Sequence, residues 1–92
     1  MAYRVVWSPR LPAFEAIAAY IALDSTTYAK AVVRTIVRAT RTLARFPRAG
    51  RKVPEFDDEN TRELIAYSYR TIYAVELKQV TIAAVIHGKR ML

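Results

Sequence analysis

Three strand-like segments follow one another in the last third of the chain, with very short connections between them. They are TRELIAY at 61–67, YRTIYAV at 69–75 and VTIAAVI at 80–86, and each contains several β-branched or aromatic residues. The short connections predict that consecutive strands are antiparallel hairpin neighbours. The last segment is apolar on both faces, which is typical of a strand in the middle of a sheet. This meander restricts the chain to folds built on a small, mostly antiparallel sheet.

The preceding sequence predicts one more strand and two helices. YRVVWS at 3–8 has the alternation of a strand, and the serine and proline that follow favour a helix start. Apolar residues at three- and four-residue spacing then predict an amphipathic helix ending near Leu23. A second helix is expected over 26–45, because the residue before Pro47 is disfavoured in a helix, and residues 48–60 form a polar connector. The order β-α-α-β-β-β predicts an α+β fold, with a helical hairpin packed on one face of the sheet.

Length and composition place limits on the class of protein. The 92 residues suit one domain, residues 1–92, and the 53% apolar and 25% charged content is that of an ordinary globular protein. There is no cysteine, which excludes disulfides and thiolate metal sites. No apolar run approaches the roughly 18 to 20 residues that span a bilayer, and the first residues lack the apolar core of a signal peptide. We therefore expect a cytoplasmic protein without a membrane segment, metal or cofactor.

The positive charge is concentrated in one part of the chain. The sequence has 15 Lys and Arg against 8 Asp and Glu, a net charge of +7. No acidic residue occurs between Ser25 and Pro54, and that stretch carries all the excess charge. The cations there are Lys30, Arg34, Arg38, Arg41, Arg45, Arg48, Arg51 and Lys52. Such a block predicts a polyanionic partner, either nucleic acid or an acidic protein segment.

Within the second predicted helix, the apolar and basic residues fall on different sides at 100° per residue. The apolar side is formed by Val32, Val33, Ile36, Thr40 and Leu43, and the basic side by Lys30, Arg34, Arg38, Arg41 and Arg45. The basic side is either a solvated face or a binding surface, and the repulsion between like charges favours a neutralising partner. A basic nucleic-acid-binding module is one hypothesis, although no groove-reading motif is present. Five aromatic residues of the predicted strands could stack on bases, but packing beneath helices is the commoner role of such residues. They are Tyr3, Trp7, Tyr67, Tyr69 and Tyr73.

The candidate chemical groups lie on the last strands. His87 could act as an acid or base, although a lone histidine at a strand end is more often a surface residue. Arg70 and Arg90 could share one exposed rim of the sheet and bind a phosphate. Alternatively, both arginines are solvated or pair with Glu63 and Glu76. A zinc site is not supported, because there is no second histidine.

The chain resembles the ParE/RelE superfamily of toxins from bacterial toxin–antitoxin modules over nearly its whole length. The resemblance rests on the order and spacing of VVWSPRLPAFEAIAAYIALDS, LARFPRAGRKVPEF, RELIAYSYRTIYAV and VTIAAVIHGKRML. It implies the fold expected above. It also implies one of two activities, because RelE-like members cleave mRNA on the ribosome, whereas ParE-like members inhibit DNA gyrase without cutting nucleic acid themselves.

Under the endonuclease hypothesis, the resemblance implies roles for Arg70 and Arg90 in phosphate binding, and for Glu55 and His87 in proton transfer. The chain departs from that pattern. Arg62 and Glu63 stand where the lysine pair would be, His87 is about one residue out of register, and no terminal tyrosine follows. Because each positioned proton-transfer group typically contributes about 10² to 10⁴ in rate, these gaps favour the ParE-like activity.

The resemblance also implies a cognate antitoxin, typically a DNA-binding dimer with an acidic, disordered tail that folds over the toxin in a hetero-oligomer. An amphipathic acidic helix could place its apolar side on the helical hairpin and its carboxylates on the basic side of the second helix. The residues predicted to contact the antitoxin are Ile17, Ile21, Arg34, Arg38, Arg41 and Arg45.

Overall fold

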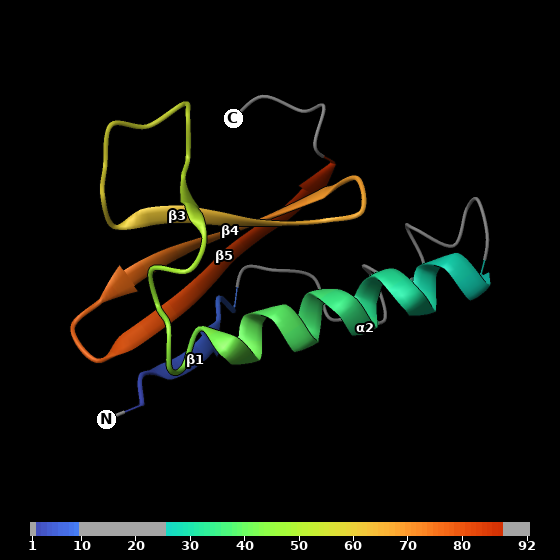
Figure 1. Ribbon diagram of the computed structural model, residues 1–92, viewed down its shortest axis with the longest axis horizontal. Helices are drawn as coiled ribbons and strands as arrows, with labels where there is room; N and C mark the ends of the chain where they lie inside the picture. The colour runs from blue at the N-terminus through green and yellow to red at the C-terminus, as the bar shows by residue number, and fades with distance from the viewer. Residues whose placement is uncertain (1, 10–25, 88–92) are drawn as a thin grey trace.

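Five strands form one mixed sheet, and a helix packs on one of its faces (Figure 1). The computed structural model describes residues 2–9 and 26–87. In chain order the elements are β1 (Arg4–Trp7), α2 (Thr26–Thr42), β2 (Arg51–Lys52), β3 (Thr61–Ala66), β4 (Tyr69–Glu76) and β5 (Gln79–His87). The predicted α+β class is confirmed. The first predicted helix, including Ile17 and Ile21, lies outside the described residues.

The strand order is β1-β5-β4-β3-β2, so the last strand of the sequence lies inside the sheet. Strands β3, β4 and β5 form the predicted antiparallel meander, and β1 pairs with β5 in parallel. The prediction that 48–60 is only a connector is wrong in part, because Arg51 and Lys52 pair with β3. A two-residue strand of two cations has no apolar alternation, so its sequence gives no strand signal.

Helix α2 places its apolar side on the sheet as predicted. The buried residues of α2 and of the turn after it recur at three- and four-residue spacing: Ala29, Val32, Ile36, Thr40 and Leu43. The helix ends at Thr42, earlier than predicted, and the chain continues in a turn with tighter i→i−3 hydrogen bonds from Leu43, Ala44 and Arg45.

The helix-facing side of the sheet forms the main core. Ala66 and Tyr69 pack with the first half of α2, and Leu43 packs with Tyr73, Val75, Val80 and Ile82. Of the five sheet aromatics, Tyr69 and Tyr73 are buried, and Tyr3 and Trp7 are partly buried against this core. Packing beneath the helix is therefore the role of these four, and Tyr67 alone of the five is exposed.

The two faces of β4 have different chemistry because successive side chains alternate across the sheet. Tyr69, Thr71 and Tyr73 lie on the α2 side, whereas Arg70 and Ile72 lie on the opposite side. A register shift between Ile72 and Tyr73, opposite β5, leaves one extra residue in β5 and maintains the apolar side of that strand toward the core. The face opposite α2 is where the candidate site residues of β3 and β4 lie.

Candidate functional site

A buried network of ion pairs occupies the face of the sheet opposite α2. Arg70 donates from Nη1 and Nη2 to the two carboxylate oxygens of Glu55, at 2.7 Å each, and from Nε to Glu63 Oε1 at 2.6 Å. Arg51 Nε donates to the other oxygen of Glu63 at 2.6 Å. The four charges therefore alternate in sign along one chain of contacts. We call Arg51, Glu63, Arg70 and Glu55 the ion-pair network.

The pairing of the strands brings these residues together. Glu63 lies opposite Ile72, and Arg70 lies two positions from Ile72 on the same face of β4, within reach across the strand pair. Arg51 pairs directly with Glu63 from β2. Glu55 follows in the loop after β2, which returns to the sheet through a hydrogen bond from Val53 N to Thr61 O.

The network is sequestered from water at its centre. The side chain of Glu63 is 0% exposed, those of Arg70 and Glu55 are 6% and 12% exposed, and only that of Arg51, at 62%, is largely in solvent. The hydrogen bonds from Arg70 to Glu55 and Glu63 raise the pKa of Arg70 above its ordinary value, against the opposing effect of burial. Arg70 is therefore a fixed cation whose charge is compensated within the protein.

The prediction that Arg70 lies on an exposed rim of the sheet is wrong, because its guanidinium is buried against two carboxylates. The alternative pairing with Glu63 is confirmed, whereas Glu76 instead accepts a hydrogen bond from Thr81. Arg90 lies outside the described residues. A phosphate that approached Arg70 would have to displace a buried carboxylate, at a cost of several kcal/mol.

The strand register separates the position of His87 from Arg70. On β5, Ile86 pairs with Arg70, and His87 pairs with Tyr69, which faces α2. Neighbouring positions in a strand lie on opposite faces, so position 87 is not on the face that carries Glu55 and Arg70. The sequence indicated that His87 is about one residue out of register with the RelE-like pattern. In a strand, an offset of one residue moves a position to the other face of the sheet.

Glu55 contacts Arg70, as the endonuclease hypothesis required of its proposed base, but both of its carboxylate oxygens are engaged. To accept a proton from a 2′-hydroxyl, Glu55 would have to release at least one charge-assisted hydrogen bond. Glu63 and Arg51 were not predicted as site residues. The available signal was a charged pair, Glu63 and Arg70, at interior positions of adjacent strands, where an unpaired charge would be costly.

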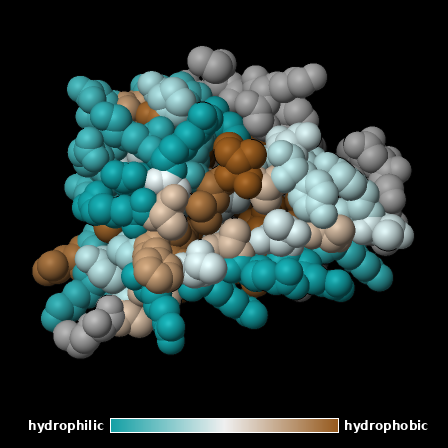
Figure 2. Space-filling model, viewed as in Figure 1, coloured by the Kyte–Doolittle hydropathy of each residue, from teal (hydrophilic) through white to brown (hydrophobic). Residues whose placement is uncertain are grey.

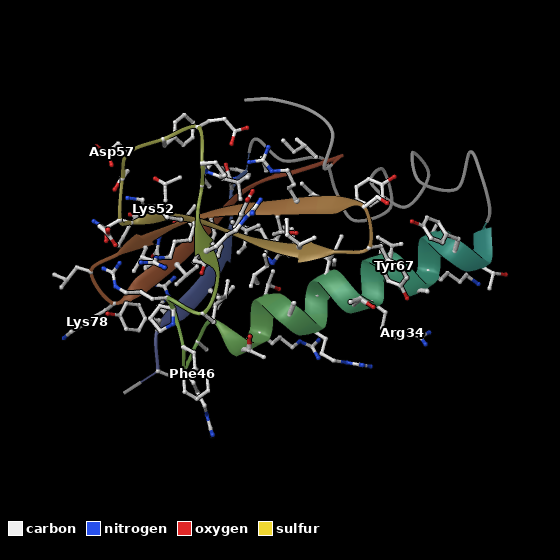
Figure 3. The ribbon with its side chains drawn as sticks, turned by 45° about the horizontal axis from the view of Figure 1, so that its top comes forward. Arg34, Phe46, Lys52, Asp57, Tyr67 and Lys78 are labelled. Atoms are coloured by element: carbon white, nitrogen blue, oxygen red, sulfur yellow. The ribbon has the colours of Figure 1, made fainter. Side chains whose placement is uncertain are left out.

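A second feature is the basic side of α2. Lys30, Arg34, Arg38 and Arg41 of the helix, with Arg45 in the turn that follows, are all exposed, and we call these five residues the α2 cationic row. Figure 2 shows hydrophilic side chains along the outer side of α2, and Figure 3 shows Arg34 pointing away from the sheet. None of the five has an ion-pair partner within residues 2–9 and 26–87.

The part of the chain that the structure describes lacks a metal-binding cluster and a membrane-spanning helix. It contains no group of three or more His, Cys, Asp or Glu side chains arranged to hold a metal ion. No helix in it combines the length and apolar character needed to cross a membrane.

Comparison with known proteins identifies the family. A family model described as the ParE toxin of type II toxin–antitoxin system, parDE, matches residues 5–92. The chain belongs to the ParE toxin family. A solved structure described as the chromosomal ParDE TA system from P. aeruginosa has the same fold as this ParE-family chain, with a TM-score of 0.72 and 18% sequence identity. The match covers 94% of this chain and 96% of the other. No curated protein matches.

Membership of this family makes the chain a toxin of a type II toxin–antitoxin system and confirms the resemblance drawn from the sequence. The match begins at Val5 in β1 and so includes both features described above, the ion-pair network and the α2 cationic row.

Proposed function

We propose that this ParE-family toxin inhibits DNA gyrase by binding, and that it does not cleave RNA. The observation that carries the proposal is the strand register, which puts position 87 on the face opposite Arg70 and Glu55. Cleavage of RNA through its 2′-hydroxyl needs a base, an acid and charge stabilisation at one reacting phosphate. In this chain the candidate positions 70 and 87 belong to opposite faces of the sheet, and the charge of Arg70 is already neutralised by Glu55 and Glu63.

The test compares both targets with the same preparation of toxin. Purified toxin is incubated with gyrase, ATP and supercoiled plasmid, and in parallel with ribosomes programmed with mRNA. We expect cleaved plasmid trapped on gyrase, or loss of supercoiling, and intact mRNA. His87→Ala should retain most of the gyrase inhibition. Cut mRNA together with unaffected gyrase would overturn the proposal.

The alternative is a ribosome-dependent endonuclease, and one observation favours it. Glu55 and Arg70 are in direct contact, as that hypothesis requires of its base and phosphate-binding arginine. Glu55→Gln keeps the shape of the side chain and one hydrogen-bond acceptor but removes the base. If the toxin cleaves mRNA, this variant and His87→Ala should both lose cleavage, whereas Lys78→Asn, in the turn before β5, should not.

We further propose that a cognate antitoxin neutralises the toxin in the cytoplasm through an acidic tail that is disordered until it binds. Its carboxylates would contact Arg34, Arg38 and Arg41 of the α2 cationic row and Arg45 beyond them, and its apolar side chains would contact Ile17 and Ile21, which precede α2 in the sequence. The row is exposed and has no ion-pair partner among residues 2–9 and 26–87, which supports this placement. Association should be fast and weakened by salt.

Charge reversal tests the antitoxin surface. Arg38→Glu with Arg41→Glu should weaken antitoxin binding by at least tenfold at low salt, with most of the change in the association rate. Reversal of two cations away from the row, Arg4→Glu with Lys78→Glu, changes the net charge equally and should have a smaller effect. Equal effects of the two pairs would exclude the row as the contact surface.

A further inference from the structure

The positive charges of the described chain fall into two classes. Around the loop after β2, three cations have carboxylate partners: Arg51 pairs with Glu63, Lys52 pairs with Asp57 and Glu59, and Arg62 pairs with Glu59. Arg48 donates to neutral acceptors, Glu59 O and Asn60 Oδ1. Figure 3 shows Lys52 and Asp57 together at this end of the molecule. The α2 cationic row has no such partners among the described residues. Among the described residues, Arg4, Arg48 and Lys78 also lack an ion-pair partner, but the longest series of cations without one lies along α2 and the turn that follows it.

The row is straight and rigid in its helical part. Lys30, Arg34, Arg38 and Arg41 follow one another at spacings of four, four and three residues, so they cover about 16 Å of helix at 1.5 Å per residue. At 100° per residue they fall in a sector roughly 80° wide, centred about 160° from the buried side of α2. A cation therefore occurs every 5 Å or so along a line that faces solvent. A duplex carries a phosphate charge about every 3.4 Å along each strand, so each cation of the row can reach a phosphate.

The surface beside the row is poor in apolar area. The exposed large apolar side chains of the described residues are Phe46, Phe56, Ile65, Tyr67 and Leu77, and none of them belongs to α2. On the helix the row is flanked on one side by Ala31, Thr35 and Thr42, and on the other by the partly buried Val33 and Val37. Protein interfaces generally need a buried apolar centre, whereas binding of a nucleic-acid backbone depends mainly on charge.

The same surface distinguishes double-stranded from single-stranded nucleic acid. Binding of single strands combines positive charge with aromatic side chains on which bases stack. Here Tyr69 and Tyr73 are buried on the side of the sheet that packs against α2, and Tyr28 is engaged edge to face with Tyr67, at 5.6 Å between ring centroids. None of the five exposed cations has an aromatic neighbour at i+3 or i+4 on α2. A row of cations without stacking platforms fits the backbone of a duplex.

We propose that the α2 cationic row binds the phosphate backbone of double-stranded DNA without reading its sequence. If the toxin inhibits gyrase as proposed above, this contact holds it on the DNA that gyrase is processing. An acidic antitoxin tail and DNA would then exclude one another from the same cations, which gives neutralisation a direct physical basis. The DNA contact depends only on the row, whereas its link to gyrase depends on the proposed function.

The first test measures binding of the free toxin to a labelled 20-base-pair duplex of arbitrary sequence by fluorescence anisotropy, over a salt series. Four cations on phosphates predict a slope of log K against log salt of about −3.6, so affinity should fall roughly 150-fold between 50 and 200 mM salt. Arg38→Gln with Arg41→Gln should reduce that slope by about 1.8. The matched control, Arg4→Gln with Lys78→Asn, removes two exposed cations elsewhere and should leave the slope nearly unchanged.

The controls decide between this proposal and its alternatives. Equal losses for the two double variants would show that net charge, and not the row, drives binding, and would overturn the proposal. Tighter binding to a single strand of the same length, or to duplex RNA, would also overturn it. Added acidic antitoxin tail peptide should release the duplex from the wild-type toxin; simultaneous binding of both would exclude a shared surface.

The link to gyrase is tested separately. The Arg38→Gln and Arg41→Gln double variant should require at least tenfold more toxin for half-maximal inhibition, and the matched control should behave as the wild type. If the double variant loses DNA binding but inhibits gyrase normally, the role of the row on gyrase-bound DNA is wrong and the proposed function stands. If the wild type binds duplex with the expected slope but leaves gyrase unaffected, the proposed function fails and the DNA site stands.

Discussion

Removal of Arg70 should destabilise the toxin far more than removal of any exposed cation. In Arg70→Met, Glu63 would keep its charge in a site where its side chain is 0% exposed, and Arg51, whose side chain is 62% exposed, would be its remaining partner in the network. Breaking a buried ion pair by removing one partner typically costs about 3 to 5 kcal/mol. A small domain has a free energy of unfolding of about 5 to 15 kcal/mol, so this variant should be marginally stable.

The assay is urea unfolding followed by the fluorescence of Trp7, which is partly buried against both core clusters. With a slope of about 1.5 kcal/mol per molar urea, the midpoint of Arg70→Met should fall by roughly 2 to 3 M. Arg51→Gln is the control, and it should lose less than about 1 kcal/mol because Arg51 is largely in solvent. Arg70→Met with Glu63→Met should recover part of the loss, since it removes both buried charges.

The pH dependence of the Arg70 contribution is also determined by the structure. The hydrogen bonds that Arg70 donates to Glu55 and Glu63 raise the pKa of Arg70, so its stabilisation is complete below the ordinary pKa of arginine and is lost only above it. The difference between wild type and Arg70→Met should therefore be the same at pH 6 and pH 9. Two results would refute the view that the network is a buried, compensated unit. One is that Arg70→Met lowers the free energy of unfolding by less than about 1 kcal/mol, and the other is that its difference from the wild type disappears between pH 6 and pH 9.

Three other substitutions test the packing around this network and the α2 cationic row. Gly50→Ala should cost about 1 to 3 kcal/mol in a thermal or urea titration, because the added Cβ would meet the Glu63 carbonyl oxygen and the Tyr73 hydroxyl. Tyr73→Phe should cost about 1 to 3 kcal/mol, since it leaves the buried Gly50 N–H without its acceptor at 2.9 Å. Burial raises the pKa of Tyr73, so its contribution is present below about pH 10 and lost above, and Tyr73→Phe should flatten the fall in stability there. Arg38→Gln should raise stability by about 0.4 to 1 kcal/mol by relieving repulsion with its like-charged neighbours, and a loss of stability would show that the row is compensated in the free toxin.

The fold could be predicted from sequence where apolar periodicity determines it. The meander of β3, β4 and β5 and the buried side of α2 could be predicted because the spacing of apolar residues within each strand or helix indicates its type and its buried side. Strand β2 could not be predicted in this way, because its two cations are held by their pairing with Arg62 and Glu63 on β3 and not by any local preference. The early end of α2 at Thr42 is likewise a detail of the turn that precedes Pro47.

The candidate site was harder to predict, because its chemistry depends on which face of the sheet each residue occupies. The endonuclease hypothesis named both Arg70 and Glu55, and the alternative reading of the sequence paired Arg70 with Glu63. In the structure, Arg70 contacts both carboxylates. Whether an arginine on a strand is a ligand-binding group or a buried partner depends on the loop that covers it, and that loop is separated from Arg70 by 15 positions. Local sequence patterns cannot predict that a residue 15 positions away will fold over Arg70.

The two charged features of the toxin have opposite energetic character, and this difference indicates their roles. In the ion-pair network, each cation is matched by a carboxylate, and all members except Arg51 lie in a site with little water, so the charges link β2, β3, β4 and the loop after β2 without attracting a ligand. In the α2 cationic row, each cation lies beside another cation in solvent, an arrangement that costs a few tenths of a kcal/mol per pair. Folding alone gives no reason to retain that cost. A polyanion that neutralises the row would regain it on binding, which is why the row, and not Arg70, is the part of this ParE-family toxin that we expect to meet its partners.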